Sequence, residues 1–236
     1  MVQNKKRTYS VPALDRGLDV LEWMARQAEP VTLTGIAQGL GFAVSEVQRP
    51  VSCLLERGYL HRQASGGYVL TGLMARLASA YPPHWRLQQA AFAPMAEFSR
   101  RHAQSIHLSV PDGDSALLLL DVPGGGLVRL SLQQGARLGR EKTVSGRLLA
   151  AYGCLPVNVK DPQKAALRKI ASRGYEVADS THAVGIVDVG VPVRDAAGQV
   201  VAALTVSCLR LRQGRQSAAK LVPHLLKCAN AVAKAI

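Results

Sequence analysis

The fold of this chain is decided by residues 31–70, which read VTLTGIAQGLGFAVSEVQRPVSCLLERGYLHRQASGGYVL. Thr34 has a hydroxyl suited to capping a helix start, and the apolar residues Ile36 and Leu40 follow it at helical spacing. Gly41 comes next, and a residue without a side chain tolerates the positive φ that commonly ends a helix. The stretch therefore predicts a short helix closed by a tight turn.

A second helix is predicted directly after this turn. Val47, Val51 and Leu54 stand at i, i+4 and i+7, which is the spacing of one buried helix face. The opposite face has short or forked polar side chains, which can contact base edges and phosphates in the major groove of DNA. The candidate DNA contacts on this face are Ser45, Glu46, Gln48, Arg49 and Ser52.

Two extended runs follow at residues 59–63 and 68–70, and the Gly-containing segment between them suits a hairpin turn. A helix, a tight turn, a second helix and a hairpin in one stretch form the pattern of a winged helix-turn-helix, a DNA-binding motif. The alternative is a small helical subdomain whose polar face is only solvated. The hairpin favours DNA binding, and the remaining candidate contacts are Arg16, Thr34 and Arg62.

The length and composition of the chain suit a folded protein of two domains, because 236 residues exceed the usual size of one domain. No apolar run of about 18 residues occurs, and the N-terminal residues lack the apolar segment of a secretory signal. We therefore expect a cytoplasmic protein without a membrane span. The four cysteines are far apart and form no C-x-x-C pair, which indicates reduced thiols rather than disulfides or a zinc site.

The chain is strongly basic, with a formal net charge of +13. Such a charge favours a polyanionic partner, since cationic surfaces release counterions from phosphates. Residues 1–81 contain nine Lys and Arg against six Asp and Glu, whereas residues 82–236 contain twenty against ten. Most of the excess therefore lies outside the predicted DNA-binding motif, and a solvated basic surface is the alternative to a second nucleic-acid contact.

Helical patterns flank the motif on both sides. Leu14, Leu18 and Leu21 predict a first amphipathic helix, and residues 73–81 predict a connecting helix that the pair Pro82-Pro83 stops. The domains that we expect are a winged helix-turn-helix at residues 1–71, a linker helix at residues 72–83 and a second domain at residues 84–236.

The second domain alternates predicted helices and strands. Strands in antiparallel pairs with helices gathered at the ends indicate an α+β fold akin to the GAF and PAS ligand-binding folds. The predicted helices cover residues 85–102, 144–152, 162–173 and 216–236. The predicted strands cover residues 105–110, 116–122, 127–132, 185–194 and 199–209.

The whole sequence resembles the IclR-type transcriptional regulators. Their landmarks recur in order, as ALDRGLDVLEWMA at residues 13–25, GGYVLTGLMARLA at residues 66–78, TVSGRLLAAY at residues 143–152 and GVPVRDAAGQVVAALTVS at residues 190–207. The resemblance implies a regulator that binds double-stranded operator DNA, responds to a small effector and forms homodimers or dimers of dimers. Pro50 inside the second helix departs from the family pattern.

The resemblance also implies where an effector binds. The positions that match the family's effector pocket are Ser145 and Gly146, then Asp179 or a near neighbour of it, then Asp188, and finally Thr205 and Ser207. Backbone amides at a helix N-terminus, those of residues 145–147, can accept the carboxylate of a small organic acid. The alternative is that the hydroxyls satisfy neighbouring backbone groups and that the aspartates are solvated.

Two further points bear on the ligand. Thr205 and Ser207 alternate with apolar residues, so both hydroxyls point to one strand face and Cys208 points to the other. Asp188 would repel an anionic ligand unless Arg147 or another cation pairs with it. An aromatic or otherwise neutral effector therefore stays open beside a small organic acid.

An enzyme, or a metabolite-binding protein that acts on a small anionic compound without regulating DNA, is the rival hypothesis. The six histidines show no metal-ligand spacing, and no G-x-S-x-G motif occurs. The glycines at 124–126 lack the Lys-Ser or Lys-Thr of a phosphate-binding loop. The sequence therefore predicts no catalytic residue, no metal and no cofactor.

Overall fold

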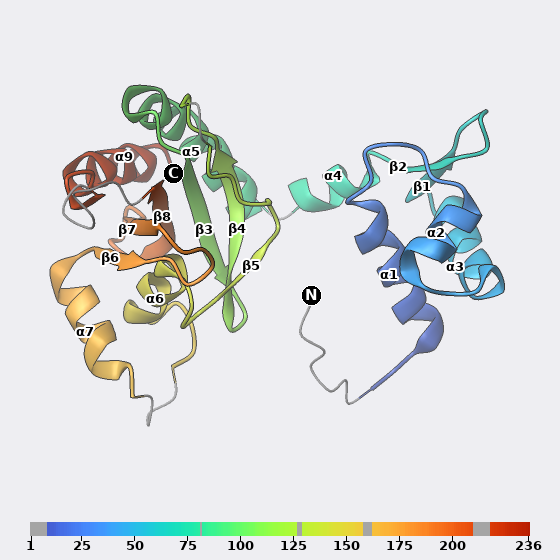
Figure 1. Cartoon of the computed structure of the whole chain (residues 1–236), viewed down its shortest axis with the longest axis horizontal. Coiled ribbons are helices and arrows are strands. Elements are labelled where there is room, and N and C mark those ends of the chain that lie inside the picture. The colour runs from blue at the N-terminus through green and yellow to red at the C-terminus, as the bar shows by residue number, and fades with distance from the viewer. Residues whose placement is uncertain (1–8, 81, 127–128, 158–161, 210–217) are drawn as a thin grey trace. The chain divides into compact units, whose positions relative to one another are not determined.

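The structure of the protein is a computed structural model that describes residues 9–80, 82–126, 129–157, 162–209 and 218–236. The chain divides into two units, Met1–Tyr81 and Pro82–Ile236 (Figure 1). The first unit has helices and a two-stranded hairpin, and the second has a six-stranded sheet between helices. The prediction of an α+β fold is confirmed.

The first unit is a winged helix-turn-helix, as the sequence predicts. The hairpin pairs Leu60 with Leu70 and Arg62 with Tyr68, and Gly41 ends the second helix with a φ of 72°. The elements of this unit are α1 (Pro12–Met24), α2 (Leu33–Leu40), α3 (Val44–Glu56), β1 (Leu60–Arg62), β2 (Tyr68–Leu70) and α4 (Leu73–Ser79).

The core of this unit lies between α1, α2 and α3. Val47, Val51 and Leu54 of α3 are buried, which confirms the predicted face of that helix. The predicted face of α1 is wrong, because the structure buries Val20 and Met24 and leaves Leu14 and Leu18 exposed at 59% and 46%. The i, i+4 spacing of leucines marks an apolar stripe but does not say which partner covers it.

Two local predictions in this unit are corrected. Thr32, not Thr34, caps α2, and its side chain accepts a hydrogen bond from the Gly35 amide at 3.2 Å. Thr34 lies inside the first turn of α2 and is exposed. Pro82 does not stop the connecting helix α4, which ends at Ser79; instead it begins the next helix, where a missing backbone N–H costs no hydrogen bond.

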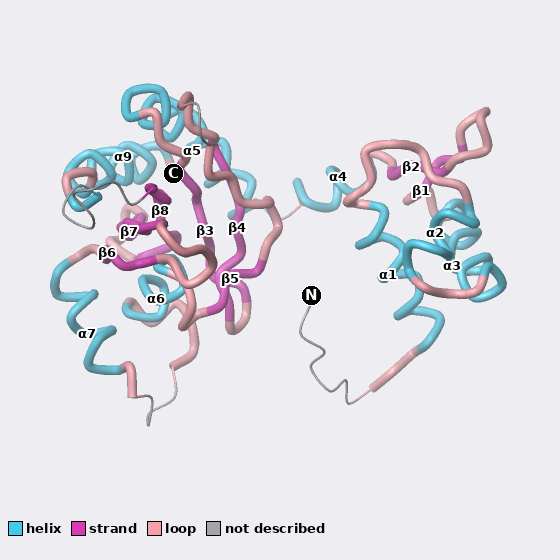
Figure 2. Tube along the Cα trace, in the orientation of Figure 1, coloured by secondary structure: helices cyan, strands magenta, loops and turns pink. Residues whose placement is uncertain are grey.

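The second unit is built on an antiparallel sheet with the strand order β5-β4-β3-β8-β7-β6 (Figure 2). Its strands are β3 (Ile106–Asp112), β4 (Ser115–Val122), β5 (Arg137–Gly139), β6 (Glu176–Asp179), β7 (Ile186–Arg194) and β8 (Val200–Leu209). Its helices include α5 (Pro82–His102), α6 (Val144–Ala151), α7 (Lys164–Arg173) and α9 (Val222–Ala235).

Helices cover both faces of this sheet (Figure 1). On one face, α5 and α9 pack on valines and leucines of β3, β7 and β8, such as Val189 and Leu204. On the other face, α6 packs on the sheet and α7 packs on α6, around Leu118, Leu148 and Ala203. We call the second face the α6 face.

Two predicted elements of this unit differ from the structure. Residues 129–132 are not a strand, residues 127–128 lie outside the described part, and the edge strand is β5 instead. The sequence predicts that the final helix begins at residue 216, but residues 216–217 lie outside the described part. In the structure, residues 220–221 form a turn and α9 begins at Val222. Alternation of apolar residues, as at 127–132, occurs in loops as well as in strands. In the described part of the chain, no helix is both long and apolar enough to cross a membrane.

Candidate functional site

The exposed face of α3 is the first candidate site. Ser45, Gln48, Arg49 and Ser52 are all exposed there, while the buried side of the helix anchors it to α1 and α2. None of these four side chains takes part in a hydrogen bond or ion pair with the described residues. The four side chains are therefore available to contact DNA.

Glu46 and Arg16 have structural partners instead. Glu46 Oε2 accepts a hydrogen bond from the Ala43 amide at 2.9 Å, and Glu46 Oε1 accepts one from Arg16 Nη2 at 3.0 Å. These two contacts, with that of Ala43 first, lower the pKa of Glu46. Arg16 also lies over the Phe42 ring, 3.6 Å from its centroid. Both residues therefore fix the start of α3 against α1.

Pro50 lies in the middle of α3, and Arg62 lies on the neighbouring wing. Pro50 cannot donate to the carbonyl four residues earlier, yet α3 continues from Val44 to Glu56 without a break. Arg62 is exposed on the wing, with its guanidinium 5.8 Å from the centroid of the Tyr68 ring. The wing thus has a basic side chain beside α3, whose exposed face is the candidate DNA contact.

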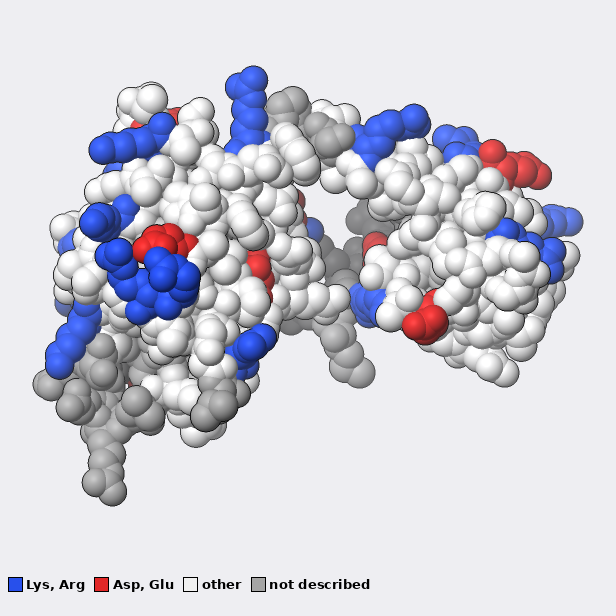
Figure 3. All heavy atoms as spheres, turned by 90° about the horizontal axis from the view of Figure 1, so that it is seen from above, with Lys and Arg blue, Asp and Glu red and all other residues white. Residues whose placement is uncertain are grey.

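Basic side chains are spread over the surface of both units. Figure 3 shows more Lys and Arg than Asp and Glu on the visible face of each unit. Some of these charges are paired, as where Glu97 contacts Arg100 at 2.6 Å and Arg101 at 3.2 Å. Exposed pairs of this kind contribute little to stability.

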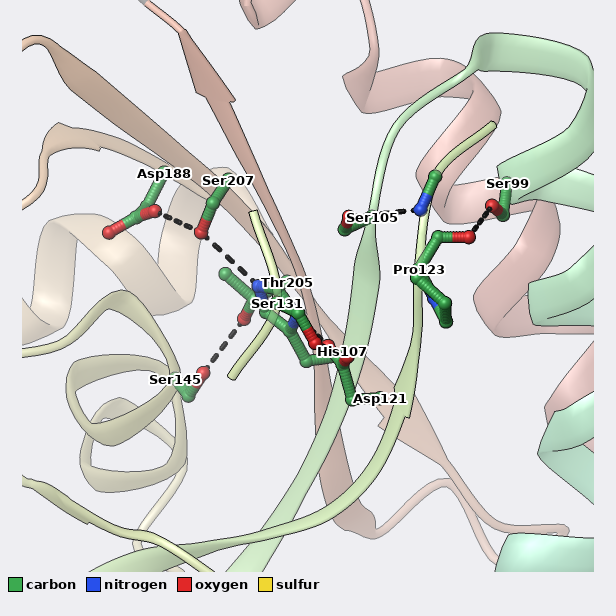
Figure 4. Close-up of polar contacts among 11 residues, drawn as sticks. Ser99, Ser105, His107, Asp121, Pro123, Ser131, Ser145, Asp188, Thr205 and Ser207 are labelled. Carbon is green, nitrogen blue, oxygen red and sulfur yellow. Dashed lines mark hydrogen bonds and ion pairs between the residues drawn. The ribbon is translucent and has the colours of Figure 1, made fainter. Parts of the chain in front are cut away.

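A second candidate site lies on the α6 face of the sheet (Figure 4). Four adjacent strands each contribute one polar side chain, and we call these four residues the polar row. Register places Asp121 of β4 opposite His107 of β3, and Ser207 of β8 opposite Asp188 of β7. His107 is opposite Thr205, two residues before Ser207 on the same strand face.

The polar row is one continuous chain of hydrogen bonds. His107 Nδ1 lies 2.9 Å from Asp121 Oδ1, and His107 Nε2 lies 3.2 Å from Ser207 Oγ. Ser207 Oγ donates to Asp188 Oδ1 at 2.6 Å, and Ser131 Oγ donates to Asp121 Oδ2 at 2.5 Å. His107 and Asp121 are nearly buried, whereas Ser207 and Asp188 are partly exposed. A ligand can therefore reach the Ser207 end of the row.

His107 lies at the centre of the row, because its two ring nitrogens contact Asp121 and Ser207. Ser207 Oγ donates to Asp188 Oδ1, and this contact of 2.6 Å is shorter than the 3.2 Å between Ser207 Oγ and His107 Nε2. Burial raises the pKa of Asp121, but the hydrogen bonds from His107 and Ser131 hold it below its ordinary value.

A β-bulge brings Asp121 into this row. Before the bulge, Leu118 faces α6 and pairs with Ser109; after it, Leu120 pairs with Leu108 and faces α5 and α9. One extra residue in β4 therefore inverts the strand and turns Asp121 toward His107. The sequence analysis missed both residues, and the only sequence signal was a polar side chain in the middle of each apolar strand.

Helix α6 meets the sheet at Thr205. Ser145 Oγ lies 2.8 Å from Thr205 Oγ1, so these two predicted effector contacts satisfy each other. Gly146 is a packing position, because a Cβ there would meet the backbone of Gly139 and Arg140 at 2.7 Å. Its amide donates to Thr143 Oγ1 at 3.0 Å.

The expected carboxylate site at this helix N-terminus is therefore corrected. The Gly146 amide has Thr143 Oγ1 as its acceptor, and the Arg147 amide has the Thr143 carbonyl, also at 3.0 Å. Two of the three amides expected to hold an anion are used within the helix cap itself.

Arg147 pairs with Glu176 and not with Asp188. Arg147 Nε donates to Glu176 Oε1 at 2.7 Å, and Arg147 Nη1 donates to the Glu141 carbonyl at 3.0 Å. Burial raises the pKa of Glu176 despite the neighbouring guanidinium. Glu176 Oε2 is buried and has no hydrogen-bond partner among the described residues. Asp188 is thus left with Ser207 as its partner.

Asp179 and Cys208 lie on the opposite face. Asp179 pairs with Val187, whose side chain belongs to the core under α5 and α9, so the structure separates it from the polar row. Cys208 is buried in the same core, as the alternation predicts, and burial raises the pKa of its thiol to about 11. Of the two aspartates considered, Asp188 is the one beside Thr205 and Ser207.

A cavity of about 270 Å³ adjoins the polar row where β3 begins and β8 ends. Ser207 lines it together with residues from the end of α5 and from the segment before α9, and Leu130 closes one side. Its size is near the lower end for a site that binds a small molecule. Among the described residues, no cluster of three or more His, Cys, Asp or Glu side chains is placed to hold a metal ion.

The fold and these two sites define a DNA-binding regulator with a separate sensing unit. Residues 13–64 match the IclR helix-turn-helix domain, and residues 158–234 match the C-terminal domain of the bacterial transcriptional regulator IclR. The chain belongs to the IclR family and is a DNA-binding transcriptional regulator.

Individual relatives span nearly the whole chain. The regulator BhcR of Paracoccus denitrificans is 27% identical over 88% of this chain and 82% of its own length. The acetate operon repressor of Salmonella typhimurium is 25% identical over 88% of this chain and 84% of its own. An IclR homologue from Microbacterium hydrocarbonoxydans, solved in complex with 4-hydroxybenzoate, matches 94% of this chain and 98% of its own with a TM-score of 0.74 and 22% identity. These matches confirm the fold and the predicted family.

Proposed function

We propose that a small compound bound at the polar row controls the affinity of this regulator for its operator. The observation that carries the proposal is the hydrogen-bonded row from Asp121 to Asp188, in which Ser207 is partly exposed and lines the adjoining cavity. The complex of the related Microbacterium protein with 4-hydroxybenzoate supports a small effector. Ser145 and Thr205 contact each other beside this row and complete the proposed site.

The proposed DNA contacts are the exposed polar residues of α3. Arg49 and Gln48 can form bidentate hydrogen bonds with base edges, and Ser45 and Ser52 can reach phosphates or bases. Thr34 on α2 and Arg62 on the wing flank this face. Glu46 and Arg16 are proposed to position α3 rather than to read bases, because each already has its partner.

We also propose that the regulator acts as a homodimer, with dimers of dimers as the larger assembly. Leu14 and Leu18 of α1 are exposed although they form an apolar stripe, and a second copy of the chain can cover them. A dimer presents two reading helices to a pseudo-palindromic operator. Light scattering of the parent protein and of a Leu14→Glu, Leu18→Glu variant tests this, since the variant should be a monomer.

The effector proposal is tested with one blocked site and one matched control. Small acids, aromatic compounds, amines and polyols are screened by thermal shift, because a ligand bound only by the folded protein raises its Tm. Operator affinity is then measured by fluorescence anisotropy on a DNA fragment selected from a random pool. Ser207→Leu should abolish the response to the ligand, and Ser172→Leu on the surface of α7 should retain it. An undiminished response in Ser207→Leu would contradict the proposal.

The order Ser207, His107, Asp121 matches that of the catalytic triad of serine hydrolases. Catalysis in such a triad requires the histidine to accept the serine proton. Here Ser207 Oγ donates to Asp188 Oδ1 at 2.6 Å, a shorter contact than the 3.2 Å between Ser207 Oγ and His107 Nε2. We therefore propose that the row binds a ligand and does not hydrolyse it. Hydrolysis of p-nitrophenyl acetate by the parent protein at a rate that Ser207→Ala removes would contradict this.

A further inference from the structure

The donors of the polar row are already used within the row. His107 lies within hydrogen-bond distance of Asp121 and of Ser207, and Ser207 donates to Asp188. A ligand that needs a donor from the row must therefore break a bond that the protein already makes. Beside the row, Arg147 donates from Nε to Glu176 and from Nη1 to the Glu141 carbonyl, which assigns two of its five N–H groups.

Two carboxylate oxygens on the same face have no hydrogen-bond partner among the described residues. One is Asp188 Oδ2, since only Oδ1 accepts from Ser207. The other is Glu176 Oε2, on a residue that is only 8% exposed. In the register of β6 and β7, Ala178 lies opposite Asp188 and Glu176 lies opposite Gly190. Glu176 and Asp188 are therefore diagonal neighbours on adjacent strands, and both lie on the α6 face.

The charge balance of this face is negative. Asp121, Asp188 and Glu176 contribute three carboxylates, against the guanidinium of Arg147 and the ring of His107, which adds one positive charge at most. Arg173 also acts on Glu176, but its side chain is exposed and its Nε donates to the Tyr175 carbonyl. The two unpartnered oxygens are acceptors in a partly dehydrated place, where a second anion is repelled and a donor is attracted.

We propose that Asp188 and Glu176 together recognise a hydrogen-bond donor group of the effector, an ammonium or a hydroxyl, and that small carboxylates are not effectors of this protein. This inference rests on the proposed effector function and adds to it the class of ligand and Glu176 as a specificity residue. A bound ammonium or hydroxyl gives Glu176 Oε2 and Asp188 Oδ2 the donors that the protein itself does not supply.

The test uses three probes with one ring skeleton and different charge. They are 4-hydroxybenzylamine, 4-hydroxybenzyl alcohol and 4-hydroxybenzoate, titrated by calorimetry into the full-length protein at millimolar concentration. The amine should bind at least about tenfold more tightly than the acid, because like charges in contact across an interface are costly. Tighter binding of 4-hydroxybenzoate, or no binding of the amine, would overturn the inference.

Substitutions that keep shape and change charge sharpen this test. Glu176→Gln and Asp188→Asn can place an amide donor where each unpartnered oxygen lies, so the double variant should lose the preference for the amine and gain affinity for the acid. Glu97→Gln on α5, which covers the opposite face, should leave the order of affinities unchanged. The single variant Asp188→Asn serves if the double variant does not fold. An unchanged order in the variants at 176 and 188 would overturn the inference.

The outcomes separate this inference from the proposed function. If 4-hydroxybenzoate changes operator affinity through Ser207, the effector function stands and the preference for donor ligands is wrong. If the amine binds through Asp188 and Glu176 but operator affinity does not respond, the recognition is right and the effector function is wrong.

Discussion

The polar side chains of the two proposed sites, one in each unit, differ in whether they have hydrogen-bond partners. On α3, Ser45, Gln48 and Arg49 are exposed and have no partner among the described residues. On the sheet of the second unit, His107, Asp121 and Ser207 are bonded to one another. Helix α3 can therefore meet DNA without breaking internal contacts, whereas a ligand of the second unit meets side chains that are already bonded to one another.

This difference explains how binding at the second unit can change the protein. We propose that a ligand donor bound at Asp188 Oδ2 perturbs the hydrogen bond that Asp188 Oδ1 accepts from Ser207, and that the change passes to His107 and Asp121 on two further strands. The exposed side chains of α3 have no comparable network. We therefore expect substitutions in the polar row to alter stability and those on α3 to alter DNA binding alone.

The largest effect is expected from removing one member of the buried pair. Asp121→Ala leaves the ring of His107 and the hydroxyl of Ser131 without their carboxylate partner, with the side chain of Asp121 only 7% exposed in the parent. The free energy of unfolding should fall by about 3–5 kcal/mol. Urea unfolding followed by circular dichroism measures it. Glu97→Ala, which removes only exposed pairs, should cost far less than Asp121→Ala, and an equal cost for both variants would contradict the account.

The next effect concerns DNA alone. Arg49→Ala should weaken operator binding by about 1–3 kcal/mol and relax selectivity at one base pair if the side chain reads a guanine. If Arg49 contacts a phosphate instead, binding to all sequences should weaken alike. The melting temperature should stay that of the parent, because the side chain makes no internal contact with the described residues. Unchanged affinity in fluorescence anisotropy would remove Arg49 from the interface.

Acid should weaken the polar row in a defined direction. The pKa of Asp121 is lower in the folded protein than its ordinary value of 3.8, so the unfolded chain binds a proton first as the pH falls. The stabilisation is complete above that value and is lost as the pH falls through the folded pKa. The difference in unfolding free energy between the parent and Asp121→Asn should therefore shrink below about pH 4. A constant difference across this range would contradict the assigned hydrogen bonds.

The smallest expected effect is a difference in thiol reactivity between the two units, and its measurement needs no substitution. Cys53 on α3 is exposed, whereas Cys208 and Cys228 are buried, and burial raises the pKa of their thiols to about 11 and about 12. Since the thiolate is the reactive form, iodoacetamide should label Cys53 in the native protein and spare the other two. Mass spectrometry of the peptides measures this. Native-state labelling of Cys228 would show that the core under α5 and α9 opens readily.

The first unit could be predicted from the sequence because its signals are local. The buried face of α3, the turn at Gly41 and the hairpin each depend on residues close together in the chain. The errors in this unit concern ends and partners: the cap of α2 is Thr32 and not Thr34, and Leu14 and Leu18 are exposed.

The site in the second unit could be predicted only in part. The family resemblance supplied Ser145, Thr205 and Ser207, and the structure brings these together with Asp188. His107 and Asp121 are beyond the reach of local patterns, because strand pairing and one bulged residue decide which face they occupy. Likewise the partner of Arg147 is Glu176, on a short strand that the sequence did not predict.

The central claim is that ligand and operator bind to two coupled sites, and coupling free energy is reciprocal. The direct measurement is the Kd of a ligand that raises the Tm, determined by calorimetry on the full-length protein with and without saturating operator DNA. The account predicts that operator changes the ligand Kd by the same factor by which the ligand changes the operator Kd, roughly 5- to 150-fold. It also predicts that this factor falls to one in Ser207→Leu. A ligand Kd that is identical with and without operator would contradict the account.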